Sequence, residues 1–476
     1  MKSKAWIIAL VCMLLCMAIL PTALAEGQID TWDGTADTSW YDAQSSEFHI
    51  TTAEQLAGVT ELVQVSTVKN FKDKTLILET DVDLAGWEWT PISTFKGFFN
   101  GNGHRIINMC VNVQKRGGSS GLFGLLYDAT VENLIIEKAD VKFGNQLTYQ
   151  GILAGRTMDS IIKNCGVSGD LISNSSPYIG GLIGSGRGKT KLQNCWSLAK
   201  IEVACTADTD GAMVGGLVGE WEGPGEIIDS YFAGTIDAAS NDSCVAGILG
   251  AGFDDDGVVQ ISGCVSYGTV TVSSTAPGYN FHIAALEENV QVENCMWPDN
   301  HQDGVARLII EWDENTGTVI MDSTFDEKLC GSAVADFSDP AIIQKLNQHS
   351  STSGLWALGI NGYPVFSSQT YLIRGDYVEV EKAKNKVPGD LSLYTDDTVS
   401  VLKELLDGID MNMSMDEQDK IDALVQDIGE AIAALKYKEA DYTKVDAAIA
   451  KAQTLSPGDY ADFSKVEAAI AAVVRG

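Results

Sequence analysis

The chain has 476 residues, too many for one ordinary domain, and a formal net charge of −33 at pH 7. So acidic a surface repels the phosphates of nucleic acids and of anionic lipids, which argues against both as partners. The solubility of an exported protein accounts for the charge. Cation binding, with Ca²⁺ as the candidate ion, is compatible with it, and no other cofactor is predicted.

The first 25 residues have the pattern of an export signal. Lys2 and Lys4 precede an apolar run at residues 6–20, and Ala23 and Ala25 supply the small residues that a signal peptidase recognises. The run is too short to span a bilayer comfortably, and no later stretch is apolar enough for a transmembrane helix. We therefore expect a secreted protein, extracellular or associated with the cell wall, in which residues 26–47 form an N-terminal segment.

A glycine-rich motif recurs about every 30 residues through the middle of the chain. Each copy is close to Gly-Leu-x-Gly and is followed by an Asn-Cys-like signature and then by a short alternating segment. Three strand-like pieces per repeat predict one coil of a right-handed parallel β-helix, because stacked coils bury a continuous core. Abundant Gly, Ser, Thr and Val argue against a helical solenoid. The last glycines of the five motifs are Gly124, Gly155, Gly184, Gly219 and Gly250.

Stacking places equivalent residues above one another at about 4.8 Å, so the second signature predicts two columns. One column alternates cysteine with Leu134 and Ser230, which indicates small buried core residues, although a disulfide between neighbouring coils remains compatible with the spacing. Its cysteines are Cys165, Cys195, Cys264 and Cys295. The other column predicts a structural amide ladder at a bend, made of Asn133, Asn164, Asn194 and Asn294.

These repeats resemble the GLUG motif of bacterial surface proteins, which also occurs beside IgA-specific metallopeptidases. The segment from Phe48-His-Ile-Thr-Thr to Trp89-Thr-Pro-Ile92 resembles the beginning of such β-helical domains, and Gly362-Tyr-Pro-Val-Phe366 resembles their end. The resemblance covers residues 48–367 and implies a β-helix there. Trp87 and Trp89 belong to the opening motif, and we expect both to pack in the core.

The composition changes after Ser367, where Ala, Lys, Glu and Leu recur with helical spacing. Residues 368–390 are assigned to a linker. Residues 391–438 resemble FIVAR-type helical modules, which occur in the stalks of large Gram-positive surface proteins, and this resemblance implies a Gram-positive source. Residues 439–476, with duplicated segments beginning at Tyr442 and Phe463, predict a second helical hairpin.

Catalytic motifs are scarce. None of the five histidines lies in HExxH, and neither a GxSxG elbow nor a Walker loop occurs. One compact acidic loop contains Asp254, Asp255 and Asp256. It is the candidate site for Ca²⁺ binding, or for the catalytic carboxylates of a polysaccharide lyase or hydrolase of the β-helix type. A solvated turn between coils is the alternative for this loop, and its spacing does not match an EF-hand.

Aromatic residues offer a binding hypothesis. Trp196 and Tyr231 fall in one column on consecutive coils, with Trp221 nearby, and stacked aromatic faces suit the apolar faces of sugar rings. Packing between coils is the alternative. The sequence thus predicts a non-catalytic surface protein for adhesion or glycan binding, with glycans or host or bacterial surface proteins as partners. A passive cell-surface spacer and a polysaccharide-cleaving enzyme are the alternatives.

Overall fold

The computed structural model describes residues 30–474, apart from short internal gaps. The gaps are 66–69, 114–117, 145–148, 175–177, 205–211, 240–242, 254–256, 274–278, 287–289, 300–304, 314–317, 326–329 and 461. The predicted export signal and the acidic residues Asp254, Asp255 and Asp256 lie outside the described residues. The chain divides into two compact units, Met1–Trp356 and Ala357–Gly476, which are described separately.

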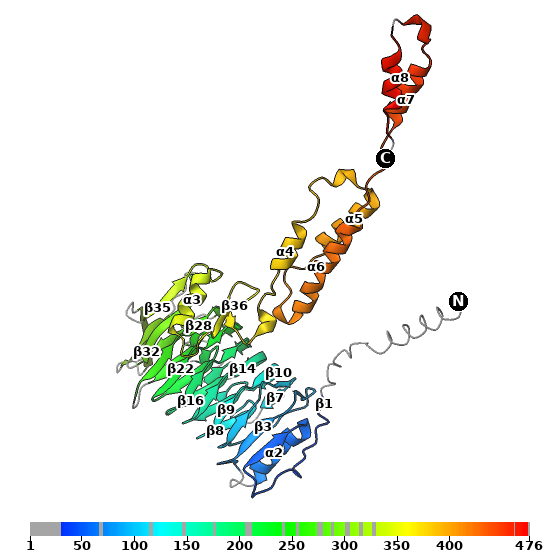
Figure 1. Cartoon of the computed structure of the whole chain (residues 1–476). Helices are drawn as coiled ribbons and strands as arrows, with labels where there is room; N and C mark the ends of the chain where they lie inside the picture. The colour runs from blue at the N-terminus through cyan, green and yellow to red at the C-terminus, as the bar shows by residue number, and fades with distance from the viewer. Residues whose placement is uncertain are drawn as a thin grey trace, which may run out of the picture. The chain divides into compact units, whose positions relative to one another are not determined.

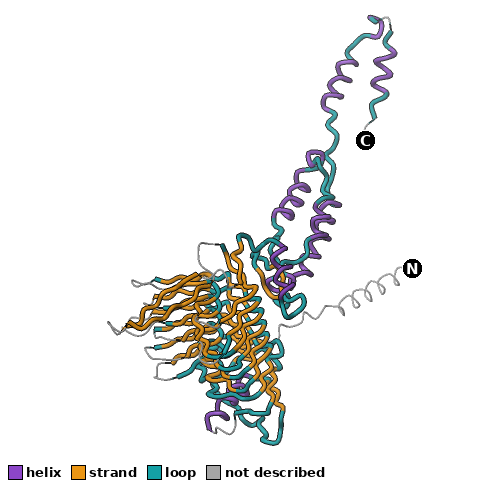
Figure 2. Tube along the Cα trace, turned by 90° about the vertical axis from the view of Figure 1, so that its left-hand side faces the viewer, coloured by secondary structure: helices purple, strands orange, loops and turns teal. Residues whose placement is uncertain are grey.

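The first unit is a mainly parallel β-solenoid, described over about seven turns (Figures 1 and 2). Its strands stack in register, so that Ile162 lies between Val131 of the preceding coil and Leu192 of the next. The prediction of a mainly-β parallel solenoid followed by helices is confirmed. The right-handedness of the solenoid and the coil length of about 30 residues remain predictions.

Of the four sheets that the described strands form, three run along the stack. The largest sheet contains β1 (Asp30–Thr31), β2 (Glu47–Ile50), β3 (Thr75–Leu78), β4 (Val82–Asp83), β5 (Phe98–Asn100), β6 (Arg105–Ile107), β7 (Cys110–Val113), β9 (Thr130–Glu132), β10 (Ile135–Phe143), β13 (Ile161–Lys163), β14 (Gly166–Ser173), β17 (Lys191–Gln193), β18 (Trp196–Ser197), β19 (Lys200–Ala204), β22 (Gly225–Ile228), β23 (Tyr231–Phe232), β24 (Thr235–Ala239), β27 (Val259–Ser262), β28 (Val265–Ser266), β29 (Thr269–Val272), β32 (Val290–Pro298) and β35 (Cys330–Val334).

The two other sheets are shorter. One contains β8 (Phe123–Tyr127), β12 (Ala154–Met158), β16 (Ile183–Arg187), β21 (Val218–Glu222), β26 (Leu249–Phe253), β31 (Ala284–Leu286), β33 (Val305–Asp313) and β34 (Thr318–Phe325). The other contains β11 (Tyr149–Gln150), β15 (Tyr178–Gly180), β20 (Met213–Gly215), β25 (Cys244–Ala246) and β30 (Tyr279–Phe281). The pair β33–β34 is antiparallel.

The Gly-Leu-x-Gly motif lies where a strand of the five-stranded sheet passes into one of the eight-stranded sheet. The chain segments approach closely there, and a Cβ added at Gly184 would lie 2.4 Å from the backbone nitrogen of Gln150. A Cβ at Gly219 would lie 2.5 Å from the backbone nitrogen of Ile179. Such distances leave no room for a side chain, which explains why the repeat requires glycine.

The N-terminal end of the solenoid is built around α2 (Ala53–Val65). Thr52 caps this helix, because its hydroxyl accepts a hydrogen bond from the backbone N–H of Gln55. The side chain of Gln55 in turn accepts from the backbone N–H of Thr51. Leu56 and Val59 of the helix are fully buried and belong to the main core. Trp89 is buried as expected, whereas the expectation was wrong for Trp87, whose side chain is 54% exposed.

A segment at residues 336–356, here called the strap, follows the last described coil. It contains α3 (Pro340–His349), which is capped by the carboxylate of Asp339 and has Pro340 at its first position. Beyond the helix, Ser351 bonds to Asp229 of the solenoid and Thr352 to Asn194. The strap therefore fastens to several coils.

The second unit is helical. It contains α4 (Val378–Lys384), α5 (Asp396–Asp407), α6 (Gln418–Ala433), α7 (Thr443–Gln453) and α8 (Ser464–Ala471), with short 3-10 turns at Thr370–Leu372, Leu391–Leu393, Met415–Glu417 and Pro457–Asp459. It begins near the strand pair β36 (Trp356–Leu358) and β37 (Pro364–Phe366). Helix α4 lies within the segment assigned to a linker, and its Val380 packs in one cluster with Ile421 and Ile428 of α6. Across the described part of the chain, no helix is both long and apolar enough to cross a membrane.

Candidate functional site

The asparagine column forms a hydrogen-bonded ladder at a bend. The side-chain amide of Asn164 donates to the side-chain oxygen of Asn133 (2.9 Å), and that of Asn194 donates to Asn164 (3.0 Å). Asn133, Asn164, Asn194 and Asn294 all have a φ between 50 and 55°. Asparagine and glycine adopt this left-handed conformation more readily than other residues. The left-handed bend and the amide ladder together explain why asparagine recurs in this column.

The cysteine column is buried and its sulfurs bond to the backbone. The thiol of Cys165 donates to the carbonyl of Lys163 (3.2 Å) and that of Cys195 to the carbonyl of Gln193 (3.3 Å). In the next coil the hydroxyl of Ser230 makes the equivalent bond to Ile228 (2.8 Å), which explains why serine fits the column. Burial raises the pKa of Cys165 and of Cys264 well above the usual value. Cys295 is also buried, and all four thiols are free.

The aromatic pair proposed for sugar binding lies beneath the strap. The rings of Trp196 and Tyr231 stack with centroids 6.5 Å apart and an interplanar angle of 17°. Trp356 of the strap covers Tyr231 at 6.0 Å, and the side chains of Trp196 and Tyr231 are only 4% and 0% exposed. Trp221 is also fully buried, in the main core against Gly186. Side chains so enclosed present no face to a ligand, so the structure contradicts a sugar-binding role for these three residues.

An open groove of about 530 Å³ crosses the outer side of the largest sheet. Its floor is a single column of residues on five successive strands, paired in register: Ile161, Lys191, Glu226, Gln260 and Gln291. Four interstrand steps give this column a length of about 19 Å. A ligand that fills the groove would therefore be elongated along the solenoid axis.

Turns that lead into these strands lie beside the groove. The turn is Asp159–Ser160 in one coil, 188–190 in the next and 223–224 in the coil after that. Pro224 lies in the third of these turns and Val258 directly precedes β27, and both residues line the groove. Gly257 is small enough to pack on Pro224, since a Cβ there would lie 2.7 Å from the proline ring.

The groove combines apolar surface with polar groups that can donate and accept hydrogen bonds. Ile161 is 46% exposed and Val258 43% exposed, and they supply the apolar part. Lys191 and Glu226 form an ion pair of 2.8 Å with both side chains about 40% exposed, a geometry that contributes little stability and leaves both groups accessible. Gln260 and Gln291 add amide groups that both donate and accept. Such a lining suits a hydroxyl-rich ligand that also has apolar faces.

A buried carboxylate lies on the outer face of the eight-stranded sheet. Glu220 is only 3% exposed, and one of its oxygens has no hydrogen-bond partner among the described residues. Burial raises the pKa of Glu220, and the nearby Ser185 and Arg187 offset this only in part. Burial, followed by the negative charge of Glu220, raises the pKa of Tyr178 to about 12. Glu220 is enclosed whereas Tyr178 is partly exposed, and neither residue lines the groove.

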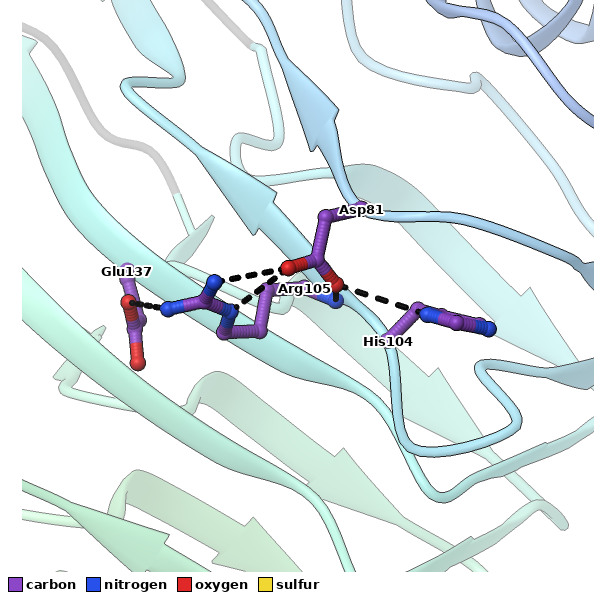
Figure 3. A network of polar contacts seen from close by, with 4 residues as sticks. All are labelled: Asp81, His104, Arg105 and Glu137. Carbon is purple, nitrogen blue, oxygen red and sulfur yellow. Dashed lines mark hydrogen bonds and ion pairs between the residues drawn. The ribbon is translucent and has the colours of Figure 1, made fainter. Parts of the chain in front are cut away.

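A polar network near the N-terminal end of the solenoid is also structural (Figure 3). Arg105 bonds to Asp81 and to Glu137, and His104 lies 3.4 Å from Asp81. Both carboxylates of this network are thus engaged by one arginine. Within the described ranges, no group of three or more His, Cys, Asp or Glu residues could hold a metal ion.

Comparison with known proteins gives two partial likenesses, and no family model matches the chain. Halomucin of Haloquadratum walsbyi is 29% identical over 182 residues, which cover 34% of this chain and 2% of halomucin. Immunoglobulin A1 protease of Streptococcus sanguinis is 30% identical over 164 residues, which cover 28% of this chain and 9% of the protease. The chain spans less than a tenth of either relative, so this chain is similar to a segment of each.

Proposed function

We propose that the protein is a non-catalytic, extracellular surface protein that binds a linear glycan along the groove between Ile161 and Gln291. A solenoid fold and partial likeness to halomucin and to an immunoglobulin A1 protease fit a surface protein. The groove is the observation that supports glycan binding.

Repetition supports a polymeric ligand. Because the floor is one column of the stack, a linear chain lying along the axis meets one new side chain about every 4.8 Å. Exposed Ile161 and Val258 can contact the apolar faces of sugar rings, while Gln260 and Gln291 bond to hydroxyl groups. Each unit then adds a modest contact, so affinity should grow with the length of the glycan.

The test uses the full chain and an array of linear oligosaccharides with their component monosaccharides. We expect the oligosaccharides to bind more tightly than the monosaccharides. The substitutions Val258→Ala and Gln260→Ala together should weaken binding about tenfold, which corresponds to roughly 1.4 kcal/mol. The matched control combines Val401→Ala and Gln426→Ala, which remove the same two side-chain types from the surface of the helical unit. Equal losses in both double variants would refute a role for the groove.

We also propose that the repeats are of the GLUG type, in a right-handed helix with coils of about 30 residues, and that residues 391–438 are a FIVAR-type module of a Gram-positive protein. The recurring glycines and the Asn-Cys signature support the first part, and the helices α5 and α6 support the second. Secretion through the signal at residues 1–25 belongs to the same proposal.

A passive spacer is the second candidate function. The regular stack and its fully buried aromatic columns favour it, because both features would serve length and stiffness without any ligand. The same glycan array separates the two functions, since a spacer predicts no saturable binding.

A further inference from the structure

Trp87 is an exposed tryptophan on an otherwise well-buried scaffold. Its side chain is 54% exposed, whereas Trp89, two residues later, is 2% exposed. Exposing so much of an indole to water costs free energy, because burial of apolar area contributes about 25 cal/mol per Å². Residues two apart in an extended chain lie on the same face, so alternation does not account for an exposed Trp87 beside a buried Trp89.

The indole is held in place before any ligand arrives. Gly34 lies directly against the ring, since a Cβ added to Gly34 would be only 3.2 Å from Trp87 Cε3. The backbone N–H of Trp87 donates to the carbonyl of Leu84 (3.0 Å), and that of Gly86 donates to Asn108 (3.1 Å). One side of the ring is therefore backed by the chain and a large part of the ring remains open. Such preorganisation lowers the entropy cost of binding.

The turn that presents Trp87 is strained. Ala85 has φ 52° and Gly86 has φ 74°, so two consecutive residues are left-handed. For alanine this conformation costs roughly 1–2 kcal/mol. The carboxylate of Asp83 maintains it by accepting hydrogen bonds from the backbone N–H of Ala85 and from the amide of Asn108, both at 2.8 Å. Strain of this kind is concentrated at functional sites.

Acidic residues adjoin Gly34 and Trp87 in the sequence. Asp33 precedes Gly34, Glu88 follows Trp87, and both side chains are exposed. Hydrogen bonds from Thr35 lower the pKa of Asp33, so that it is ionised at neutral pH. Carboxylates accept hydrogen bonds from hydroxyl groups and repel other anions. The surroundings thus favour an uncharged, hydroxyl-rich molecule with a flat apolar face.

We propose that Trp87 is the stacking platform of a second saccharide site, which takes an uncharged sugar ring and lies apart from the groove. The open part of the indole contacts the C–H face of the ring, and Asp33 and Glu88 accept hydrogen bonds from its hydroxyl groups. This site stands independently of the proposed groove, because it involves the first coils and none of the groove residues.

The test uses the full chain, an array of uncharged and sialylated oligosaccharides, and titration with the uncharged sugars that bind. Trp87→Ala should weaken binding of uncharged sugars at least tenfold, and Trp87→Phe should retain part of the affinity because an aromatic face remains. Asp33→Asn and Glu88→Gln should each weaken it to a smaller extent. The indole N–H resonance that disappears in Trp87→Phe should shift when sugar is added to the unsubstituted protein.

Controls separate this site from the groove and from loss of folding. Tyr460→Ala, at another exposed aromatic residue, and the double variant Val258→Ala with Gln260→Ala should leave the Trp87 resonance shift unchanged. Thermal unfolding should show that Trp87→Ala remains folded, with at most a small loss of stability from the contact with Gly34. The proposal is overturned if Trp87→Ala binds uncharged sugars as tightly as the original protein, or if no uncharged sugar shifts the Trp87 resonance.

Discussion

Arg105 donates two hydrogen bonds to the same carboxylate oxygen of Asp81, from Nε at 2.9 Å and from Nη2 at 2.7 Å. Its remaining nitrogen, Nη1, bonds to Glu137 at 3.2 Å. Burial raises the pKa of Asp81, but the hydrogen bonds and charge of Arg105 outweigh it and lower the pKa overall. A single arginine therefore links coils near the N-terminal end of the stack.

Asp81→Asn should reduce the free energy of unfolding by about 1 kcal/mol at pH 7, a modest value because the arginine is partly exposed. A lowered carboxyl pKa gives stability that is present above the unfolded value of 3.8 and is lost as the pH falls through the folded pKa. The difference between variant and parent should accordingly disappear in strong acid. Urea unfolding at several pH values measures this, with Asp140→Asn, at an exposed ion pair, as the control.

Glu220→Gln should have the opposite pH dependence. The pKa of Glu220 is raised in the folded protein. The contribution of Glu220 to the free energy of unfolding is therefore most favourable below the unfolded pKa of 4.5, and it is lost as the pH rises through the folded pKa. The glutamine variant avoids burying a charge and should unfold at a higher temperature than the parent at pH 7, with less advantage at pH 4. A variant that is less stable than the parent at pH 7 would show that Glu220 forms a favourable pair there.

Ala85→Gly should stabilise the protein by up to about 1 kcal/mol, because glycine adopts the left-handed conformation without the steric cost paid by alanine. The gain is limited by the greater freedom of glycine in the unfolded chain. Thermal unfolding compares this variant with Ala434→Gly, whose φ of −78° is ordinary and which should be destabilised instead. A loss of stability in Ala85→Gly would contradict the strain assigned to this turn.

The four column thiols should be inert in the folded protein. Cys165, Cys195, Cys264 and Cys295 are buried, and thiol reactivity depends on the accessible thiolate. A thiol-specific reagent should therefore modify them only after unfolding, and peptide mapping should recover each one in reduced form. Recovery of the Cys165 and Cys195 peptides joined by a disulfide would contradict this expectation. It would instead support a disulfide between neighbouring coils.

Much of the fold was predictable because every coil of the stack needs the same residue type at the same position. Glycine at Gly184 and Gly219 is demanded by close backbone approach, and asparagine at Asn164 by a left-handed bend, so the same residue type returns in each coil. Periodicity could therefore indicate parallel stacking without any knowledge of the loops.

Features that depend on distant segments could not be predicted in this way. Trp196 and Tyr231 are enclosed because Trp356, more than a hundred residues later, folds back over their column. Nothing in the repeat itself signals that cover. Trp87 and Trp89 look alike in the sequence, and no pattern in it distinguishes the exposed tryptophan from the buried one.

The groove was also missed, for a different reason. Ile161, Lys191 and Glu226 share no residue type, so no motif marks them as one column. Their alignment emerges only when the register of neighbouring coils is known. A search of the sequence for exposed, variable positions at one fixed place in each repeat would have been the available signal.

The most direct test of the central proposal is titration of the full chain with linear glycans of increasing length, followed by the groove variants. Our account predicts affinity that rises with chain length until the column of about 19 Å is covered, and a loss of about tenfold when Val258 and Gln260 are both replaced by alanine. Affinity that is independent of glycan length and unchanged in that double variant would contradict it.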